Sequence, residues 1–151
     1  MASRKPSTLH QVQIYFVGAN CFVVPSNYRA RNGLWVECMP VIQLTKPNAD
    51  ALAVALEQAQ SASGIESPQS VSWDGQKGRV WKNAAGYWTV RWLADNTISI
   101  APQKSVPLKT DAETGEVRDG GWKPDRDRQQ IVPGDTPLRV IAEIALAGQE
   151  S

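Results

Sequence analysis

Apolar residues in the first third of the chain either alternate with polar ones or form short continuous runs, a pattern typical of β-strands. Residues 11–17 begin with alternation and end wholly apolar, which predicts a strand that runs from an exposed edge into a buried sheet. After a turn at 18–20, the predicted strands are 21–24, ended by Pro25, and 34–39, with 41–44 either extending the latter or forming a fourth strand.

The period then changes to that of an α-helix, which is predicted over 48–61. Its apolar positions recur at i, i+3, i+4 and i+7 and are Leu52, Ala55, Leu56 and Ala59. Asn48 or Asp50 lies near the start as a capping residue, and Gly64 lies just past the end.

The second half opens with strand-like segments again, at 71–73, 79–82, 87–93 and 97–100. Because strand side chains alternate, Trp88 and Trp92 share one face of 87–93 and Tyr87 lies on the other. We predict that Trp88 and Trp92 fill a core between sheet and helix. For Trp81 and Tyr87, core and surface positions both remain open.

From 102 to 130 the periodicity fails, because Pro, Gly and charged residues dominate. The pattern predicts an irregular stretch, and a hairpin around Gly120 and Gly121 is the alternative. A strand at 130–133 follows, and residues 135–138 offer a capping residue and a proline at the first position of a second helix, which Gly148 closes. The apolar stripe of this helix consists of Leu138, Ile141, Ala142 and Ala145.

The two halves share one order of elements: several short strands, a proline-flanked cap and one amphipathic helix. Residues 41–48 and 130–137 occupy equivalent places before the two helices. We therefore predict an α+β fold that is a pseudo-duplicated antiparallel β-meander plus helix, ββββα-like, twice. The length predicts one domain over 10–151, behind a flexible N-terminal tail at 1–9.

Composition narrows the class of protein. A chain of 151 residues with 42% hydrophobic residues suits one globular core. Its apolar runs are far shorter than the roughly 20 residues that cross a bilayer, and its first residues lack the apolar region of a secretory signal. We therefore expect a cytoplasmic protein with no membrane partner, in which Cys21 and Cys38 are free thiols rather than a disulfide.

The residues of catalytic chemistry are scarce. His10 is the only histidine and lies where the tail meets the first strand, and neither cysteine belongs to a nucleophile motif. One histidine and two distant cysteines also lack the spacing of a zinc site. We therefore expect no enzyme, no metal and no cofactor, and a protein that acts by binding another macromolecule.

The irregular stretch is the candidate binding surface. A long polar connection in a compact domain is often functional, loops on a rigid scaffold commonly carry recognition, and a lone tryptophan among charges resembles an interface anchor. The predicted partner-binding residues are Asp111, Glu113, Glu116, Asp119 and Trp122. The alternative is a mobile loop with Trp122 packed on the core, and neighbouring cations such as Arg118 and Lys123 dilute the acidic charge.

A second candidate surface is the segment 79–92, where three cations are interleaved with four aromatic residues. Such strands hold single-stranded nucleic acid by base stacking and phosphate attraction. The net charge of only +1 argues against strong binding of a polyanion. We therefore do not expect nucleic acid to be the partner.

Several segments together resemble a known family. They are 13–18 (Gln-Ile-Tyr-Phe-Val-Gly), 33–36 (Gly-Leu-Trp-Val), 40–44 (Pro-Val-Ile-Gln-Leu) before an alanine/leucine-rich helix, the tryptophan-rich middle, and 133–138 (Pro-Gly-Asp-Thr-Pro-Leu). This order resembles the small bacterial immunity proteins that neutralise the toxin tips of contact-dependent growth-inhibition systems. The likeness covers nearly the whole chain and consists of pattern rather than of a diagnostic motif.

The resemblance implies a cytoplasmic immunity protein that binds a cognate toxin domain. Many such toxins are nucleases with basic clefts, which an inhibitor usually meets with acidic residues. The duplicated order is also similar to that of Whirly-type single-strand binders, so a Whirly-like architecture and a single-stranded nucleic-acid-binding module form the competing interpretation.

Overall fold

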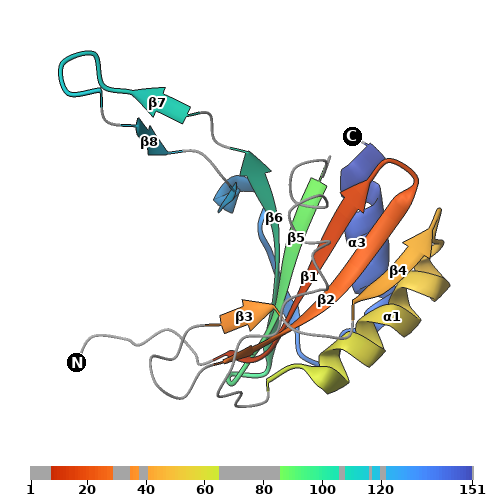
Figure 1. Cartoon of the computed structure of the whole chain (residues 1–151). Coiled ribbons are helices and arrows are strands. Elements are labelled where there is room, and N and C mark those ends of the chain that lie inside the picture. Colours follow the sequence, from red (N-terminus) through yellow and green to blue (C-terminus); the bar gives the residue numbers. More distant parts are fainter. Residues whose placement is uncertain are drawn as a thin grey trace, which may run out of the picture.

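The computed structural model describes residues 8–28, 35–37, 41–64, 86–105, 108–115, 117–119 and 122–150. Its main layer is an eight-stranded antiparallel sheet, and two helices cover one face of this sheet (Figure 1). A separate two-stranded sheet extends away from the end of one strand. The predicted α+β class with a meander-plus-helix order is confirmed.

Two hairpins form the centre of the sheet. β1 (Thr8–Val17) and β5 (Gly86–Leu93) pair with each other, and each continues into its own hairpin partner. The partner of β1 is β2 (Asn20–Tyr28), and that of β5 is β6 (Thr97–Ser105). Two short strands line the outer side of each hairpin: β4 (Ile42–Thr45) and β3 (Trp35–Glu37) pair with β2, and β10 (Gln130–Pro133) and β9 (Trp122–Pro124) pair with β6.

The two halves thus repeat one topology of hairpin, two short outer strands and helix, as the duplicated pattern predicts. In both halves, an equivalent backbone hydrogen bond joins the residue that follows the last short strand to the turn of the hairpin. Lys46 N donates to Ala19 O at 2.7 Å, and Gly134 N donates to Asn96 O at 2.7 Å. In each case the residue after the last short strand is tied to the turn of its own hairpin.

β2 continues past Pro25, so the prediction that it ends there is wrong. Pro25 is the sixth residue of the nine-residue β2, and Pro102 is the sixth residue of the nine-residue β6. Each proline lies between the part of its strand that pairs with one short neighbour and the part that pairs with the other. Because proline lacks an N–H donor, it is tolerated where the outer ladder is interrupted.

The first helix, α1 (Ala49–Ala62), matches its prediction. The side chain of Asn48 caps it by accepting a hydrogen bond from Ala51 N at 2.8 Å. Gly64, with φ of 77°, follows its end and adopts the left-handed conformation that favours glycine.

The second helix, α3 (Leu138–Glu150), starts directly after Pro137. The sequence predicts that it ends at Gly148, and this prediction is wrong, because the helix continues to Glu150. Gly148 lies inside the helix and faces the Trp88 ring so closely that a methyl group at its Cα would overlap the ring. A packing contact, rather than a helix stop, therefore explains this glycine.

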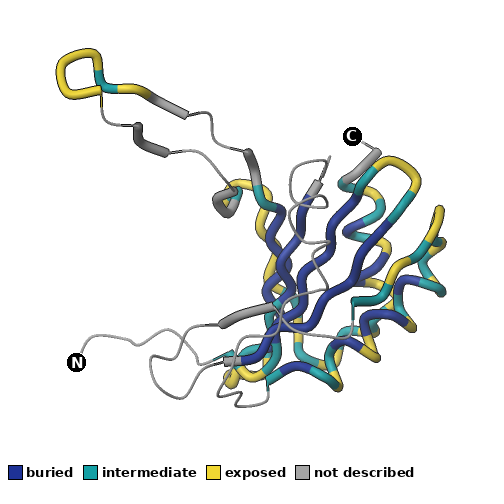
Figure 2. Tube along the Cα trace, viewed as in Figure 1, coloured by how far each residue is buried: buried dark blue, intermediate teal, exposed yellow. Residues whose placement is uncertain are grey.

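The helix-facing side of the sheet forms the main core. Trp88 and Trp92 are 2% and 8% exposed, and both belong to the cluster that joins the sheet to α1 and α3. The prediction that they fill a core between sheet and helix is confirmed. Figure 2 shows this buried layer as the dark blue centre of the molecule.

The opposite face of the sheet carries a second, smaller cluster. The rings of Tyr15 and Tyr87 stack with their centroids 4.4 Å apart and their planes within 5°. Phe22 and Val24 complete the cluster, and all four residues are buried. Tyr87, which the sequence leaves undecided, is therefore a core residue.

The stretch after Pro102 is more regular than predicted. β6 runs on to Ser105, and β7 (Leu108–Thr110), β8 (Val117–Asp119), β9 and the short 3-10 helix η1 (Arg126–Arg128) follow. A hairpin is present, but its turn lies at 111–115 rather than at Gly120 and Gly121. The pairing of β7 with β8 was not visible in the sequence because each strand contributes only three residues.

Some predictions fall outside the described residues. These are the tail residues 1–7, Cys38, the strands at 71–73 and 79–82 with Trp81, and Gly120 and Gly121. Cys21 is a buried free thiol.

Candidate protein-binding surface

The candidate surface is an arm formed by residues 103–128, which comprise the end of β6, the β7–β8 hairpin, β9 and η1. In Figure 1 the β7–β8 hairpin extends away from the eight-stranded sheet. It forms its own two-stranded sheet. The arm is therefore a protrusion carried on a rigid scaffold.

The turn at the tip of the arm is built by Asp111. Its Oδ1 accepts hydrogen bonds from Glu113 N at 2.8 Å and from Thr114 N at 3.2 Å, and its carbonyl accepts one from Gly115 N at 2.9 Å. Gly115, with φ of 72°, supplies the left-handed residue that closes the turn. Aspartate at this position favours the turn because its side chain satisfies backbone donors.

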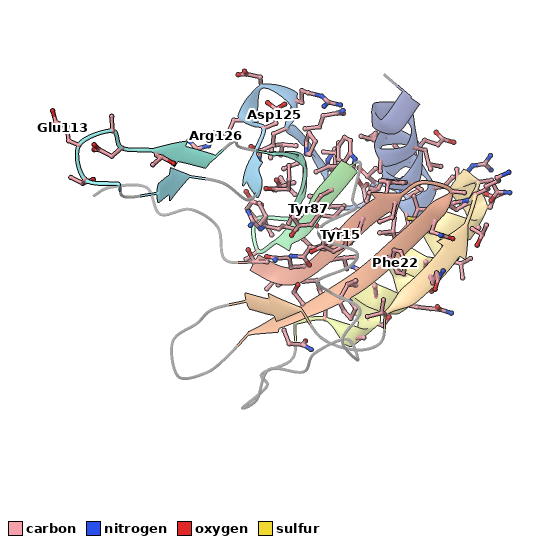
Figure 3. The ribbon with its side chains drawn as sticks, turned by 45° about the horizontal axis from the view of Figure 1, so that its top comes forward. Tyr15, Phe22, Tyr87, Glu113, Asp125 and Arg126 are labelled. Atoms are coloured by element: carbon pink, nitrogen blue, oxygen red, sulfur yellow. The ribbon has the colours of Figure 1, made fainter. Side chains whose placement is uncertain are left out.

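The tip is exposed, as the yellow segment in Figure 2 shows. Glu113 points away from the rest of the molecule at the far end of the arm in Figure 3. Its carboxylate therefore lies at the outer end of the arm.

The structure distributes the five predicted partner-binding residues along the arm. Asp111 and Glu113 lie together at the tip, Asp119 lies in β8 opposite Leu108, and Trp122 lies in β9 opposite Ser105. Glu116 is outside the described residues. The acids and the tryptophan therefore do not form one compact patch, and their contact with a partner stays a prediction.

The base of the arm is fixed to the sheet. Asp125 N donates to Pro102 O at 2.8 Å, and Gln129 Nε2 donates to Ser99 Oγ at 2.8 Å. In Figure 3 Asp125 and Arg126 lie at this base, far from Glu113. The arm is thus held where it leaves the sheet.

Arg128 ties the same base to the second helix. Its guanidinium carbon lies 5.9 Å from the centre of the Trp88 ring, and Nη2 donates to Gly148 O at 3.4 Å. An open groove of about 520 Å³ lies here, between η1 and the end of α3, with Ile144 on the helix side. The groove therefore lies between the base of the arm and the second helix.

The strand pairing places the cations of the arm in two pairs, whereas the sequence identified Arg118 and Lys123 only as residues that dilute the acidic charge. Lys104 pairs with Lys123 in the β6–β9 register, and Lys109 pairs with Arg118 in the β7–β8 register. Charge along the sequence shows both signs in this stretch, but only the strand pairing shows that like charges occupy opposite positions. The turn at the tip therefore carries two acids, and the paired strands behind it carry four cations together with Asp119.

His10, the only histidine of the sequence, has a structural position. Its Nδ1 lies 3.2 Å from Ser63 O and 3.1 Å from Ser63 Oγ, just past the end of α1. These contacts hold the end of the helix to the start of β1. Within the described ranges, no group of three or more His, Cys, Asp or Glu residues is arranged to hold a metal ion.

The burial of tryptophans also bears on nucleic-acid binding. Stacking on bases requires exposed aromatic faces, whereas Trp88 and Trp92 are enclosed between sheet and helices. Tyr87 is buried as well, with its ring stacked on that of Tyr15. Three of the four aromatic residues in the second candidate surface are therefore unavailable to a nucleic acid, and the fourth, Trp81, lies outside the described residues. None of the helices that the structure describes has the length and apolar character needed to span a membrane.

No protein-family model matches the chain, and no curated protein matches its sequence. Among solved structures, the fold is similar to that of a protein of unknown function from Neisseria meningitidis, with a TM-score of 0.61, 11% identity and coverage of 98% of this chain and 99% of that chain. It is also similar to a chain of the CdiA-CT/CdiI toxin and immunity complex from Yersinia pseudotuberculosis, with a TM-score of 0.58, 12% identity and coverage of 95% and 98%. At these identities the likeness shows the fold alone.

Proposed function

We propose that this chain is a cytoplasmic immunity protein that binds and neutralises a cognate toxin domain of a contact-dependent growth-inhibition system, and that it is not an enzyme. The observation that carries the proposal is the end-to-end similarity to a chain of the CdiA-CT/CdiI toxin and immunity complex. The likeness covers 95% of this chain and 98% of that chain.

That complex contains both a toxin and its immunity partner, so the role of inhibitor needs separate support. One feature is that Nδ1 of His10 contacts Ser63 and so holds the end of α1 to β1, which gives the only histidine of the sequence a structural role. Another is the exposed, charged arm on a rigid sheet, which suits recognition of a protein surface.

The test is a growth assay with the product of the gene immediately upstream, which is the candidate toxin. We expect that inducing this gene arrests growth, that co-expression of the chain restores growth, and that the two proteins co-purify. An unrelated small cytoplasmic protein expressed at the same level is the control and should give no rescue.

Two results would overturn the proposal. One is growth arrest caused by the chain itself, which would assign it to the toxin side. The other is failure of rescue and of co-purification when both proteins are soluble.

A further inference from the structure

An unpaired hydrogen-bond donor lies in the wall of the groove between η1 and the end of α3. Trp88 lines this groove and is only 2% exposed. Among the side chains that the structure describes, its Nε1 is the only buried nitrogen or oxygen atom without a hydrogen-bond partner. A buried donor without an acceptor costs free energy, so its presence in a folded protein needs an explanation.

The nitrogen lies at the edge of the indole ring that faces the second helix. Cζ2 and Cη2 of Trp88 are the atoms nearest to the position that a methyl group at Gly148 would occupy, and in indole a single carbon joins Cζ2 to Nε1. Gly148 itself lines the groove. An acceptor that enters between η1 and α3 would therefore approach the ring from the side that carries the N–H group.

Arg128 provides a positive charge for the same acceptor. Its guanidinium carbon lies 5.9 Å from the centre of the Trp88 ring, and its hydrogen bond to Gly148 O is long at 3.4 Å. Both ion pairs among the described side chains are formed by Arg139, so Arg128 has no carboxylate partner in this part of the chain. Because the Arg128 side chain is exposed and weakly held, it can turn away from the ring and uncover the edge with Nε1.

We propose that this groove binds the carboxylate of a glutamate or aspartate side chain of the protein partner. The carboxylate pairs with Arg128, draws the guanidinium away from Gly148 O and accepts the hydrogen bond of Trp88 Nε1. The methylene part of the same side chain packs on Ile144 and Ala147, which line the helix side of the groove. The inference rests on the proposed function in that it takes the partner to be a protein, and it adds a contact at the base of the arm.

Asp127 favours a protein over a nucleic acid as the source of the negative charge. Its exposed carboxylate also lines the groove, so it repels a ligand that carries several anionic groups in a row. A protein surface presents single carboxylates beside neutral and cationic groups. Such a surface can therefore satisfy Arg128 without bringing a second negative charge close to Asp127.

The test uses the full chain and three probes: the peptide acetyl-Ala-Glu-Ala-amide, the peptide acetyl-Ala-Gln-Ala-amide and thymidine monophosphate. Both peptides are capped, so the glutamate side chain is the only carboxylate that they offer. The readout is the indole N–H resonance of Trp88 in a proton–nitrogen NMR spectrum, which Trp88→Phe assigns. We expect the glutamate peptide to shift this resonance downfield at millimolar concentration, and the uncharged glutamine peptide to bind about two- to fivefold more weakly.

Two arginines of the same short helix provide matched variants. Arg128→Gln removes the cation that lines the groove and should weaken binding of the glutamate peptide by about two- to fivefold. Arg126, labelled in Figure 3, also lies in η1 and is exposed, but it does not line the groove. Arg126→Gln removes an equal charge and should leave peptide binding unchanged. An unshifted indole resonance of Trp92 in both variants shows that the core is retained.

The inference is overturned by any of three results: a Trp88 resonance that does not respond to the glutamate peptide, equal binding of the two peptides, or equal effects of Arg126→Gln and Arg128→Gln. A response to thymidine monophosphate at lower concentration than to the peptide also overturns it, because the groove would then be a phosphate site.

Failure of the inference is distinguishable from failure of the proposed function. Rescue of growth by a chain whose Trp88 resonance does not respond to the glutamate peptide sinks the inference alone. Binding of the glutamate peptide that depends on Arg128, without rescue of growth, sinks the proposed function alone.

Discussion

At Gly148, intrinsic helix propensity and tertiary packing act in opposite directions. Alanine in place of glycine inside a helix usually gains about 1 kcal/mol. Here a methyl group would overlap the Trp88 ring, and overpacking costs about 1–3 kcal/mol. The difference between the two terms leaves a net loss, so we expect Gly148→Ala to lower the free energy of unfolding by up to about 2 kcal/mol in urea denaturation.

Repeating the Gly148→Ala substitution in a Trp88→Phe variant tests whether the contact with the Trp88 ring causes the loss of stability. Trp88→Phe shortens the ring that Gly148 faces, so Gly148→Ala in that background should cost much less or become stabilising. Such coupling is the non-additivity expected of residues in contact. Equal costs in the two backgrounds would show that the glycine is required for another reason.

Cys21 gives the chain a dependence on alkaline pH. Burial raises the pKa of its thiol from 9.0 to about 12. The stability that the neutral thiol contributes is present below about pH 9 and is lost as pH rises toward 12, because the unfolded chain then releases a proton that the folded chain retains. The slope approaches about 1.4 kcal/mol per pH unit.

We expect the free energy of unfolding to fall less steeply between about pH 8 and about pH 10.5 in Cys21→Ala than in the parent. The variant also loses packing, but that loss shifts the whole curve rather than its slope. Parallel curves would contradict the buried, neutral thiol. In the unfolded parent protein without reductant, alkylation should label both Cys21 and Cys38, and an unlabelled pair would indicate a disulfide.

At the scale of elements, the two acidic residues at the tip of the arm are expected to have different roles: Asp111 builds the turn, and Glu113 contributes charge. Asp111→Ala removes the acceptor of two backbone donors, each hydrogen bond being worth about 0.5–1.5 kcal/mol. We expect faster amide exchange in β7 and β8 with little change in the global melting temperature. Asp111→Asn keeps an acceptor and loses the charge, so its exchange should stay close to that of the parent.

Glu113→Gln is the matched change of charge without a change in the turn. It should leave amide exchange unaltered and slow association with the partner, because peripheral charges act mainly on the association rate.

The prediction for Asp111 has its own contradicting result. If amide exchange in Asp111→Ala is as slow as in the parent, the Asp111 carboxylate does not build the turn.

Elements with a clear period were predictable, whereas elements defined by pairing were not. The stripe through Leu52 and Leu56 and the cap at Asn48 locate α1 without any tertiary information. Pro25 is a local stop signal, and only the interrupted outer ladder explains why β2 passes through it. Gly148 likewise has the sequence signature of a helix end, and only the position of Trp88 shows otherwise.

For the candidate surface too, features that follow from local sequence were predictable, and features that depend on strand pairing were not. Its location in the stretch after Pro102 was predictable from the loss of periodicity, and so was its exposed polar character. The charge pattern of the arm was not, since Lys109 and Arg118 are nine positions apart in sequence and become neighbours only through the register of β7 and β8.

For the molecule as a whole, the duplicated topology leaves the β7–β8 hairpin outside the repeated unit. Each half needs only a hairpin, two short outer strands and a helix, and the two halves meet through β1 and β5 and through the shared core. The β7–β8 hairpin is inserted between β6 and β9 of the second half, at a place where the first half connects β2 to β3. Stability and recognition are therefore expected to reside in different parts of the chain.

This separation can be tested by removing the β7–β8 hairpin. Ser105 and Trp122 are directly opposite in the β6–β9 register, so residues 106–121 can be replaced by Asn-Gly, which forms the two-residue turn favoured between paired strands. We expect the free energy of unfolding to stay unchanged or to rise by about 1–2 kcal/mol, because a shorter loop costs less entropy to close. Rescue of growth and co-purification with the toxin should be lost. If the shortened protein folds and still protects, the contact surface lies elsewhere, and the segment 79–92 becomes the next candidate.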